Sequence, residues 1–277
     1  MAQLREVPKI ADDADPRVQD PRSDSPALLE MAPDGVGEQL ITLLAPTSFE
    51  ADQYRVLRHR IESIRRDREC RVIGVTSAVA GEGKTTTAIN LAGALSQSPG
   101  ARVLLVDVDL RLSGMSRQLG LEDAGSPGLT EAILDEDGSL EEVVRRWEAV
   151  NLSVLPGGRG LSSPPEALQS SRFGTLLAEA RQRYEFVILD APPLLPVPDS
   201  RLIARWVDGF LVIVAAHVTT RRLLEEALRA LEPDKVLGLV FNGADRPPRG
   251  YYGYYHGFAP APKRRSRLWG RLMGRMS

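Results

Sequence analysis

The residues of this chain best suited to chemistry begin with a lysine and two glycines in the segment VIGVTSAVAGEGKTTTAINLA, residues 72–92. A strand-like apolar run precedes them and a helix-like run follows, which is the context that a P-loop requires. In such a loop, backbone N–H groups converge on phosphate oxygens at a helix N-terminus, where the dipole favours anions. Lys84 is then expected to reach the β- and γ-phosphates of ATP, and the Thr85 hydroxyl to ligate Mg²⁺. The candidate nucleotide-binding residues of the loop are Ala80, Gly81, Glu82, Gly83, Lys84, Thr85 and Thr86.

One position of this segment departs from the simplest P-loop pattern, because Ala78 stands where the first glycine is usual. A small residue suffices there, since the tight turn near the phosphates is expected at Gly81 to Gly83. The alternative interpretation is a glycine turn with an incidental lysine. The flanking strand and helix argue against that alternative.

Three aspartates follow two other strand-like runs. Asp107 and Asp109 close the run LLVDVDLR, and Asp190 closes FVILDAPP. Ligands of an open parallel sheet bind at the carboxyl ends of its strands, so these carboxylates and the P-loop are expected to converge. Buried carboxylates repel one another unless a cation or hydrogen bonds compensate them, and Mg²⁺ prefers oxygen ligands. The alternative for any single aspartate is a helix cap after a strand.

These residues need a scaffold, and the pattern of the chain predicts one. Short β-branched runs alternate with helical patterns from RVIGVTS at residues 71–77 to KVLGLVFNG at residues 235–243. Such alternation predicts a doubly wound α/β fold with a mostly parallel sheet covered on both faces. Ahead of it, apolar residues at helical spacing predict an amphipathic helix over residues 52–66. The whole domain is expected to span residues 47–245.

The two ends of the chain differ from this domain. Residues 1–46 contain six prolines and many acids without a sustained apolar period, so we expect a disordered arm. In residues 246–277 prolines and glycines interrupt any helix or strand at first, and a basic segment follows. We expect this second segment to be a solvated tail.

Composition narrows the compartment and the classes of function. Cys70 is the only cysteine, so no internal disulfide is possible and a reducing compartment is expected. The first residues lack the apolar run of a signal peptide, and no apolar stretch approaches the roughly 20 residues that span a bilayer. The formal net charge of −2 gives no reason to expect nucleic-acid binding. We therefore expect a cytoplasmic protein.

Taken together, the motifs TSAVAGEGKTTTAINLA, VLLVDVDLR and VILDAPP resemble those of the bacterial tyrosine kinases of capsule and exopolysaccharide synthesis, the BY-kinases. The resemblance runs from about Asp52 to Asp245 and includes GLTEAIL, NLSVLPGG and VLGLVFNG. It implies a P-loop NTPase fold like that of the partitioning ATPases. Those ATPases carry an extra lysine five positions before the P-loop lysine. Val79 stands there in this chain, which favours the kinase branch.

The resemblance also implies roles for single residues. Asp107 would be linked to Mg²⁺ and would act as the base toward a tyrosine hydroxyl. Asp109 would support the metal site, and Asp190 would bind or orient Mg²⁺ and its waters. Lys84 completes the catalytic set, and Asn242 matches a position that contacts adenine.

A third implication is assembly into a homo-oligomer, with a ring as one form. Asp52, Arg55 and Arg58 resemble the family's Glu-x-x-Arg-x-x-Arg oligomerisation motif, with Asp in place of Glu. The alternative is a solvated, charged helix face. A further departure follows Arg111, where Leu112 and Ser113 replace the family's Arg-Pro pair.

Two segments near the C-terminus are candidates for function, a tyrosine cluster that fits an autokinase and a basic segment that could contact a membrane. The candidate phosphoacceptors are Tyr251, Tyr252, Tyr254 and Tyr255. An extended chain from Asp245 to Tyr255 reaches about 35 Å, enough to enter the site of a neighbouring subunit, so phosphorylation in trans is expected. Residues 263–277 carry six basic residues and could lie as an amphipathic helix on an anionic membrane surface. The alternatives are an unmodified low-complexity tail and a merely solubilising one.

The resemblance as a whole implies a protein-tyrosine autokinase that uses ATP and Mg²⁺ and regulates exopolysaccharide or capsule polymerisation or export. Its partner would be a membrane-embedded polysaccharide co-polymerase that activates it at the inner face of the cell membrane. A second hypothesis is a nucleotide-binding scaffold of that machinery without protein kinase activity. A third is a partitioning-type ATPase that cycles on a surface. ATP hydrolysis without phosphotyrosine would separate both from the kinase.

Overall fold

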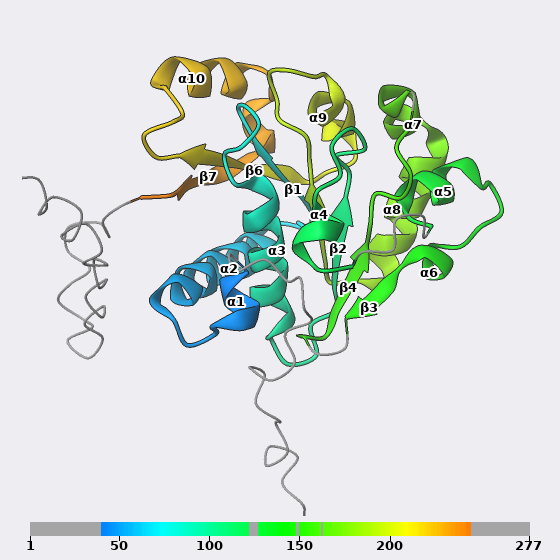
Figure 1. Cartoon of the computed structure of the whole chain (residues 1–277), viewed down its shortest axis with the longest axis horizontal. Helices are drawn as coiled ribbons and strands as arrows, with labels where there is room; N and C mark the ends of the chain where they lie inside the picture. The colour runs from blue at the N-terminus through cyan, green and yellow to red at the C-terminus, as the bar shows by residue number, and fades with distance from the viewer. Residues whose placement is uncertain (1–39, 122–126, 148–149, 162, 245–277) are drawn as a thin grey trace, which may run out of the picture. The chain divides into compact units, whose positions relative to one another are not determined.

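The computed structural model describes residues 40–121, 127–147, 150–161 and 163–244 (Figure 1). Within these residues, strands β1 to β7 form one sheet in the order β3-β4-β2-β5-β1-β6-β7. Neighbouring strands are parallel except β3 and β4, so the predicted mostly parallel sheet is confirmed. The strands are β1 (Val72–Ser77), β2 (Val103–Asp107), β3 (Arg145–Trp147), β4 (Leu152–Leu155), β5 (Phe186–Asp190), β6 (Gly209–Ala215) and β7 (Val236–Asn242).

Helices alternate with these strands along the chain (Figure 1). They are α1 (Ile41–Leu44), α2 (Phe49–Asp67), α3 (Lys84–Ser96), α4 (Met115–Gln118), α5 (Leu129–Leu134), α6 (Leu140–Val143), α7 (Pro164–Gln169), α8 (Ser171–Arg183), α9 (Asp199–Leu202) and α10 (Arg221–Arg229). Among the described residues, 3₁₀ turns cover Ile203–Arg205 and Pro233–Lys235. No helix in the described ranges is long and apolar enough to cross a membrane.

Strand β2 shows how the sheet serves two hydrophobic cores. Val103 and Leu105 belong to the cluster that includes residues of α2 and α3, whereas Leu104 and Val106 belong to the cluster that includes α8. Successive side chains of a strand point to opposite faces of the sheet, so each face has its own core. A strand that is apolar throughout is therefore explained by helices on both faces.

The register of three central strands positions the polar residues. Strand β5 lies between β2 and β1, and the pairing aligns Asp107 with Asp190 and Asp190 with Val75. Strand β1 ends two residues after Val75, at Ser77, and the P-loop follows. The carboxyl ends of three adjacent strands therefore meet the P-loop at one edge of the sheet, where an open parallel sheet binds its ligands.

Helix α2 confirms the predicted amphipathic helix and extends it at both ends. The hydroxyl of Ser48 caps it by accepting a hydrogen bond from the Ala51 N–H at 3.1 Å. Ile61 is buried, and Leu57 and Ile64 pack against the same core. The apolar stripe predicted from the sequence is thus the face that packs into this core, chiefly against α3.

Residues 40–46 correct the predicted disordered arm. Leu40, Thr42 and Leu43 are buried, and α1 begins within the stretch that was assigned to the arm. Thr42 donates its backbone N–H to the Asn90 side chain at 2.9 Å. A Cβ on Gly93 of α3 would lie 2.9 Å from side-chain atoms of Thr42 and Leu43, so this glycine allows the close approach. The remaining predicted arm, residues 1–39, and the tail after residue 244 lie outside the described residues.

Candidate active site

The P-loop joins β1 to α3, and two glycines determine its shape. Gly81 and Gly83 have φ angles of 83° and 88°, in the left-handed region that favours glycine. A Cβ on Gly83 would lie 2.0 Å from the amide nitrogen of Asn242, so a larger residue would displace that side chain. The loop backbone therefore stays free of side chains at the start of α3, where a phosphate can approach the N–H groups.

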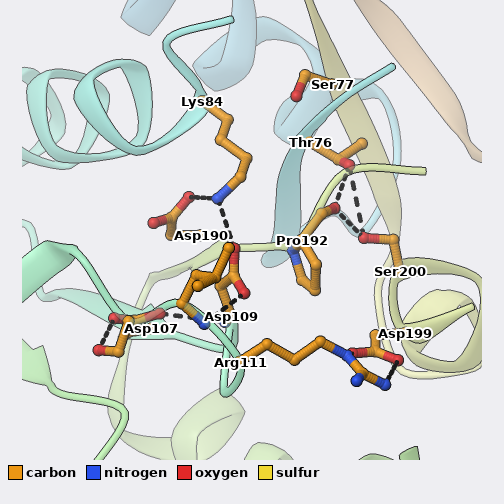
Figure 2. A network of polar contacts seen from close by, with 12 residues as sticks. Thr76, Ser77, Lys84, Asp107, Asp109, Arg111, Asp190, Pro192, Asp199 and Ser200 are labelled. Carbon is orange, nitrogen blue, oxygen red and sulfur yellow. Dashed lines mark hydrogen bonds and ion pairs between the residues drawn. The ribbon is translucent and has the colours of Figure 1, made fainter. Parts of the chain in front are cut away.

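Lys84 points at a group of aspartates (Figure 2). Its Nζ donates a hydrogen bond to Oδ2 of Asp109 at 2.9 Å and lies 3.7 Å from Oδ1 of Asp190. Burial alone would lower the pKa of Lys84, but the charges of Asp190 and Asp109 outweigh it and raise that pKa. Lys84 is therefore held as a cation among the carboxylates, as the predicted convergence requires.

Asp107 is fully buried, and both of its oxygens accept hydrogen bonds. The Asp109 N–H donates to Oδ1 at 3.1 Å, and the Ser113 hydroxyl donates to Oδ2 at 2.6 Å. Burial raises the pKa of Asp107, and these two bonds offset only part of that rise. A raised pKa makes this carboxylate a better proton acceptor than an exposed one. At the position where Ser113 replaces the family's proline, the structure thus shows a bond to the candidate base.

Asp190 is buried, yet its set of partners is incomplete. Burial raises its pKa, while Lys84 and a hydrogen bond from Thr85 lower it to a lesser extent. Its Oδ1 accepts no hydrogen bond from any residue that the structure describes. A carboxylate oxygen that accepts no hydrogen bond, beside a hydroxyl, forms an oxygen donor pair of the kind that Mg²⁺ takes.

The remaining donors also fit a nucleotide-bound Mg²⁺ better than a protein cage. The described ranges contain no group of three His, Cys, Asp or Glu side chains arranged to hold a metal ion. Mg²⁺ usually keeps several waters and takes its other ligands from one or two carboxylates and substrate phosphates. Thr85 and Asp190 beside the P-loop match that pattern, and Asp107 lies opposite Asp190 in register.

The other predicted nucleotide-binding residues lie around the same loop. Ala80 is exposed within it, and Thr86 in the first turn of α3 donates to Gln118 at 3.3 Å. Asn242, at the end of β7, donates its amide to the Glu82 carbonyl at 3.1 Å. The structure therefore brings Asn242 to the P-loop, and its predicted contact with adenine stays a prediction.

Sequence reasoning missed an ion pair beside this site. Arg111 donates from Nε to Oδ2 of Asp199 at 2.7 Å and from a terminal nitrogen to Oδ1 at 3.2 Å (Figure 2). Asp199 is fully buried at the start of α9, so this pair ties α9 to the segment after β2. Nearby, Thr76 and Ser200 both donate to the carbonyl of Pro192. Arg111 and Asp199 are 88 residues apart, and no local pattern signals their contact.

The predicted oligomerisation residues lie together on α2, and each arginine has partners in its own chain. Arg55 forms an ion pair with Asp52. Arg58 donates to the carbonyl of Ala94 on α3 at 3.2 Å and lies 3.7 Å from Glu62. These contacts within the chain orient both arginine side chains. Their role in oligomerisation stays a prediction.

Two further predictions concern residues outside those that the structure describes. One is the tyrosine cluster of residues 251–255, and the other is the basic segment of residues 263–277. Modification of the first and membrane contact of the second both stay predictions.

Comparisons with known proteins place this site in a wider group. A family model described as an AAA domain matches residues 70–217. The tyrosine-protein kinase YwqD of Bacillus subtilis (strain 168) is 35% identical over 218 residues, which cover 78% of this chain and 90% of YwqD. The succinoglycan biosynthesis transport protein ExoP of Rhizobium meliloti (strain 1021) is 32% identical over 224 residues, covering 78% of this chain and 28% of ExoP.

A solved structure gives the same picture. The BceF tyrosine kinase domain matches with a TM-score of 0.65 at 30% sequence identity, and the match covers 73% of this chain and 81% of that domain. The match to residues 70–217 includes the P-loop, the ends of β2 and β5, and thus the lysine and aspartates described above.

Proposed function

Since the chain belongs to the family of bacterial protein-tyrosine kinases, we propose that it transfers the γ-phosphate of ATP to tyrosines, including those of its own C-terminal cluster. The observation that carries this proposal is the convergence of Lys84 with three buried aspartates at one edge of the sheet. These aspartates are Asp107, Asp109 and Asp190. Beside a phosphate-binding loop, a lysine cation can hold the triphosphate. A carboxylate next to it can accept a proton.

In this proposal the P-loop backbone and Lys84 bind the β- and γ-phosphates. The incoming phosphate replaces Asp109 as the partner of the lysine, because both groups are anionic and compete for the same Nζ. Thr85 and Asp190 would hold Mg²⁺, with Asp107 and Asp109 beside it. Bound Mg²⁺ neutralises charge on the phosphate oxygens. Asn242 would contact the adenine from the end of β7.

Asp107 is the proposed base. A tyrosine hydroxyl has an ordinary pKa of about 10 and is a poor nucleophile until a neighbouring group takes its proton. In the transfer, the tyrosine oxygen bonds to the γ-phosphorus, the bond from that phosphorus to the bridging oxygen breaks, and ADP leaves. The phenolic proton goes to the Asp107 carboxylate. Burial, which raises the pKa of Asp107, supports this role.

The proposed acceptors are Tyr251, Tyr252, Tyr254 and Tyr255, modified in trans. An extended chain from Asp245 to Tyr255 reaches about 35 Å, which is enough to enter the site of a neighbouring subunit. Each phosphate adds nearly two negative charges, which would loosen a homo-oligomer by repulsion. Asp52, Arg55 and Arg58 are the proposed contacts of that oligomer, with a ring as one form.

The proposed setting is the cytoplasmic face of the cell membrane. There the chain would act with a membrane-embedded polysaccharide co-polymerase that activates it and would regulate exopolysaccharide or capsule polymerisation or export. The name of ExoP, a succinoglycan biosynthesis transport protein, supports a link between this domain and polysaccharide export. The basic segment of residues 263–277 would add contact with anionic lipids.

The test is phosphopeptide mapping after incubation with Mg·ATP, with and without a candidate activator. We expect phosphotyrosine in residues 251–255 of the unchanged chain and none in the Lys84→Met or Asp107→Asn variants. The exposed Asp137→Asn substitution serves as the control and should leave the modification intact. Nucleotide binding or hydrolysis without phosphotyrosine would instead support the scaffold or the partitioning-type ATPase.

A second arm tests transfer in trans. A full-length chain with the four clustered tyrosines changed to phenylalanine supplies the kinase. A full-length Asp107→Asn chain that keeps its tyrosines supplies the acceptor. Phosphotyrosine on the acceptor chain is the expected result, and its absence would restrict the reaction to transfer within one chain.

A further inference from the structure

The loop between β6 and α10 is held closely at the P-loop side of the sheet. The Ala216 N–H donates to the Asn242 carbonyl at 2.8 Å, and the Thr219 N–H donates to the Ala215 carbonyl at 2.9 Å. His217 between them adopts a φ of 65°, in the left-handed region that few non-glycine residues occupy. This loop therefore has a defined conformation and can position a neighbour.

The neighbour is Glu82, in the middle of the P-loop. The Thr219 hydroxyl accepts the Ala215 N–H at 2.8 Å and donates to Oε1 of Glu82. The other carboxylate oxygen, Oε2, accepts the Val79 N–H at 3.1 Å. Glu82 is only 1% exposed, so these bonds, and not solvent, satisfy its charge.

The same residue is held a second time through its backbone. Asn242 at the end of β7 donates to the Glu82 carbonyl at 3.1 Å. Glu82 lies between Gly81 and Gly83, the two residues of the loop with left-handed φ angles. Glycines accept many conformations, so they do not by themselves select the one that receives phosphates. Contacts to Glu82 from the loop after β6 and from the end of β7 restrict the loop to one of them.

We propose that Thr219 is a positioning residue of the nucleotide site, which through its bond to Glu82 holds the P-loop in the conformation that receives the phosphates. The bond also fixes where the negative charge of Glu82 lies, on the side of Val79 and Thr219. A carboxylate freed from Thr219 could turn toward the phosphates and repel them. This inference rests on the part of the proposed function that assigns Mg·ATP to the P-loop.

The experiment uses the full-length chain and measures the Kd of Mg·ATP by calorimetry, together with kinase kinetics. Thr219→Val keeps the shape of the side chain and removes the hydroxyl. We expect Kd and the KM for ATP to rise about tenfold, equivalent to about 1.4 kcal/mol, with kcat at saturating ATP changed little. Thr219→Ser keeps the hydroxyl and should bind Mg·ATP like the unchanged chain.

Thr220 provides a matched control. Its hydroxyl caps α10 by accepting the Leu223 N–H at 3.3 Å and, among the described residues, makes no hydrogen bond to the P-loop. Thr220→Val should lower the melting temperature and leave the Kd of Mg·ATP unchanged. An equal change in Kd for Thr219→Val and Thr220→Val would overturn the proposal, because it would show a general effect of the loop.

A mutant cycle tests the link from the other side. Glu82→Ala should weaken Mg·ATP binding, and adding Thr219→Val to it should have no further effect, because the two residues act through one bond. Additive losses, or wild-type affinity in a folded Thr219→Val chain, would contradict the proposal. Tyrosine transfer that is absent while these affinities still shift would refute the kinase function alone. Failure of the unchanged chain to bind Mg·ATP would refute both.

Discussion

Buried or half-buried carboxylates lie at both ends of β1, one at the amino end and several at the carboxyl end, and their partners differ. At the amino end, Asp208 accepts the N–H groups of Arg71 at 2.7 Å and Val72 at 2.8 Å. Both of its oxygens also accept hydrogen bonds from Arg181, at 2.9 and 2.7 Å. Burial opposes ionisation of Asp208, but these donors outweigh it and lower its pKa.

At the carboxyl end the result is the reverse. Burial raises the pKa of Asp107 and of Asp190, and Lys84 does not compensate fully. The chain thus provides donors to both oxygens of Asp208 and leaves Oδ1 of Asp190 without a hydrogen bond from the described residues. We infer that Asp208 stabilises the fold, whereas Asp107 and Asp190 are costly to ionise, which fits the ligand-binding role proposed for them.

The largest expected effect separates activity from stability at the carboxyl end. Asp107→Asn should reduce tyrosine phosphorylation about 100-fold or more, because the amide cannot take the phenolic proton. Its free energy of unfolding should fall by less than the roughly 2 kcal/mol expected for Asp208→Asn, since burial already penalises the ionised form of Asp107. Phosphotyrosine rates and urea unfolding measure the two quantities. A large loss of stability would remove the proposed distinction from Asp208.

The converse substitution is Asp208→Asn. Losing charge-assisted bonds to Arg181 and to two backbone N–H groups should cost about 2 kcal/mol of unfolding free energy. The Kd of Mg·ATP should not change, because Asp208 lies at the opposite end of β1. Urea unfolding and calorimetry test this pair of outcomes, with Asp137→Asn as the exposed control.

Acid should remove the stabilisation of the fold that ionised Asp208 provides. The folded chain lowers the pKa of Asp208, so the stability from this group is fully present above the unfolded value of about 4 and is lost as pH falls through the folded pKa. The stability difference between the unchanged chain and Asp208→Asn should therefore shrink in acid. Unfolding curves from pH 7 downward measure it, and a difference that stays constant into strong acid would contradict the assignment.

The smallest expected effect concerns Ser113. Ser113→Ala leaves Oδ2 of the buried Asp107 without its donor and should cost about 1 kcal/mol of stability. Ser98→Ala is the matched control, because the Ser98 hydroxyl donates to Glu62 at 2.9 Å. The Glu62 carboxylate is partly exposed, so water can replace the lost hydroxyl. Equal costs in urea unfolding would show that burial does not distinguish the two sites.

Much of this site was predictable from local sequence. The P-loop has a strand before it and a helix after it, and Asp107 and Asp190 each end an apolar strand. One rule, that parallel strands present their carboxyl ends at the same edge, then suffices to bring these residues together. The helix at α2 was predictable for a similar reason, since its apolar period is contained in the segment itself.

The rest depends on contacts that no local pattern encodes. Helix α1 has only four residues, too few for a period, and it is stabilised by Asn90 and by space above Gly93. Thr219 meets Glu82 across 137 residues of sequence. In each case the partner lies on a distant element, so only the folded chain shows the pair.

Lys84 already has anionic neighbours before any nucleotide arrives, so ATP binding is an exchange of counter-charges. A triphosphate that takes the lysine leaves Asp109 and Asp190 without their cation. A divalent ion restores the balance, and each of the two ligands therefore removes a penalty that the other would meet alone. We expect Mg²⁺ and ATP to bind cooperatively, each raising the affinity of the other by the same factor.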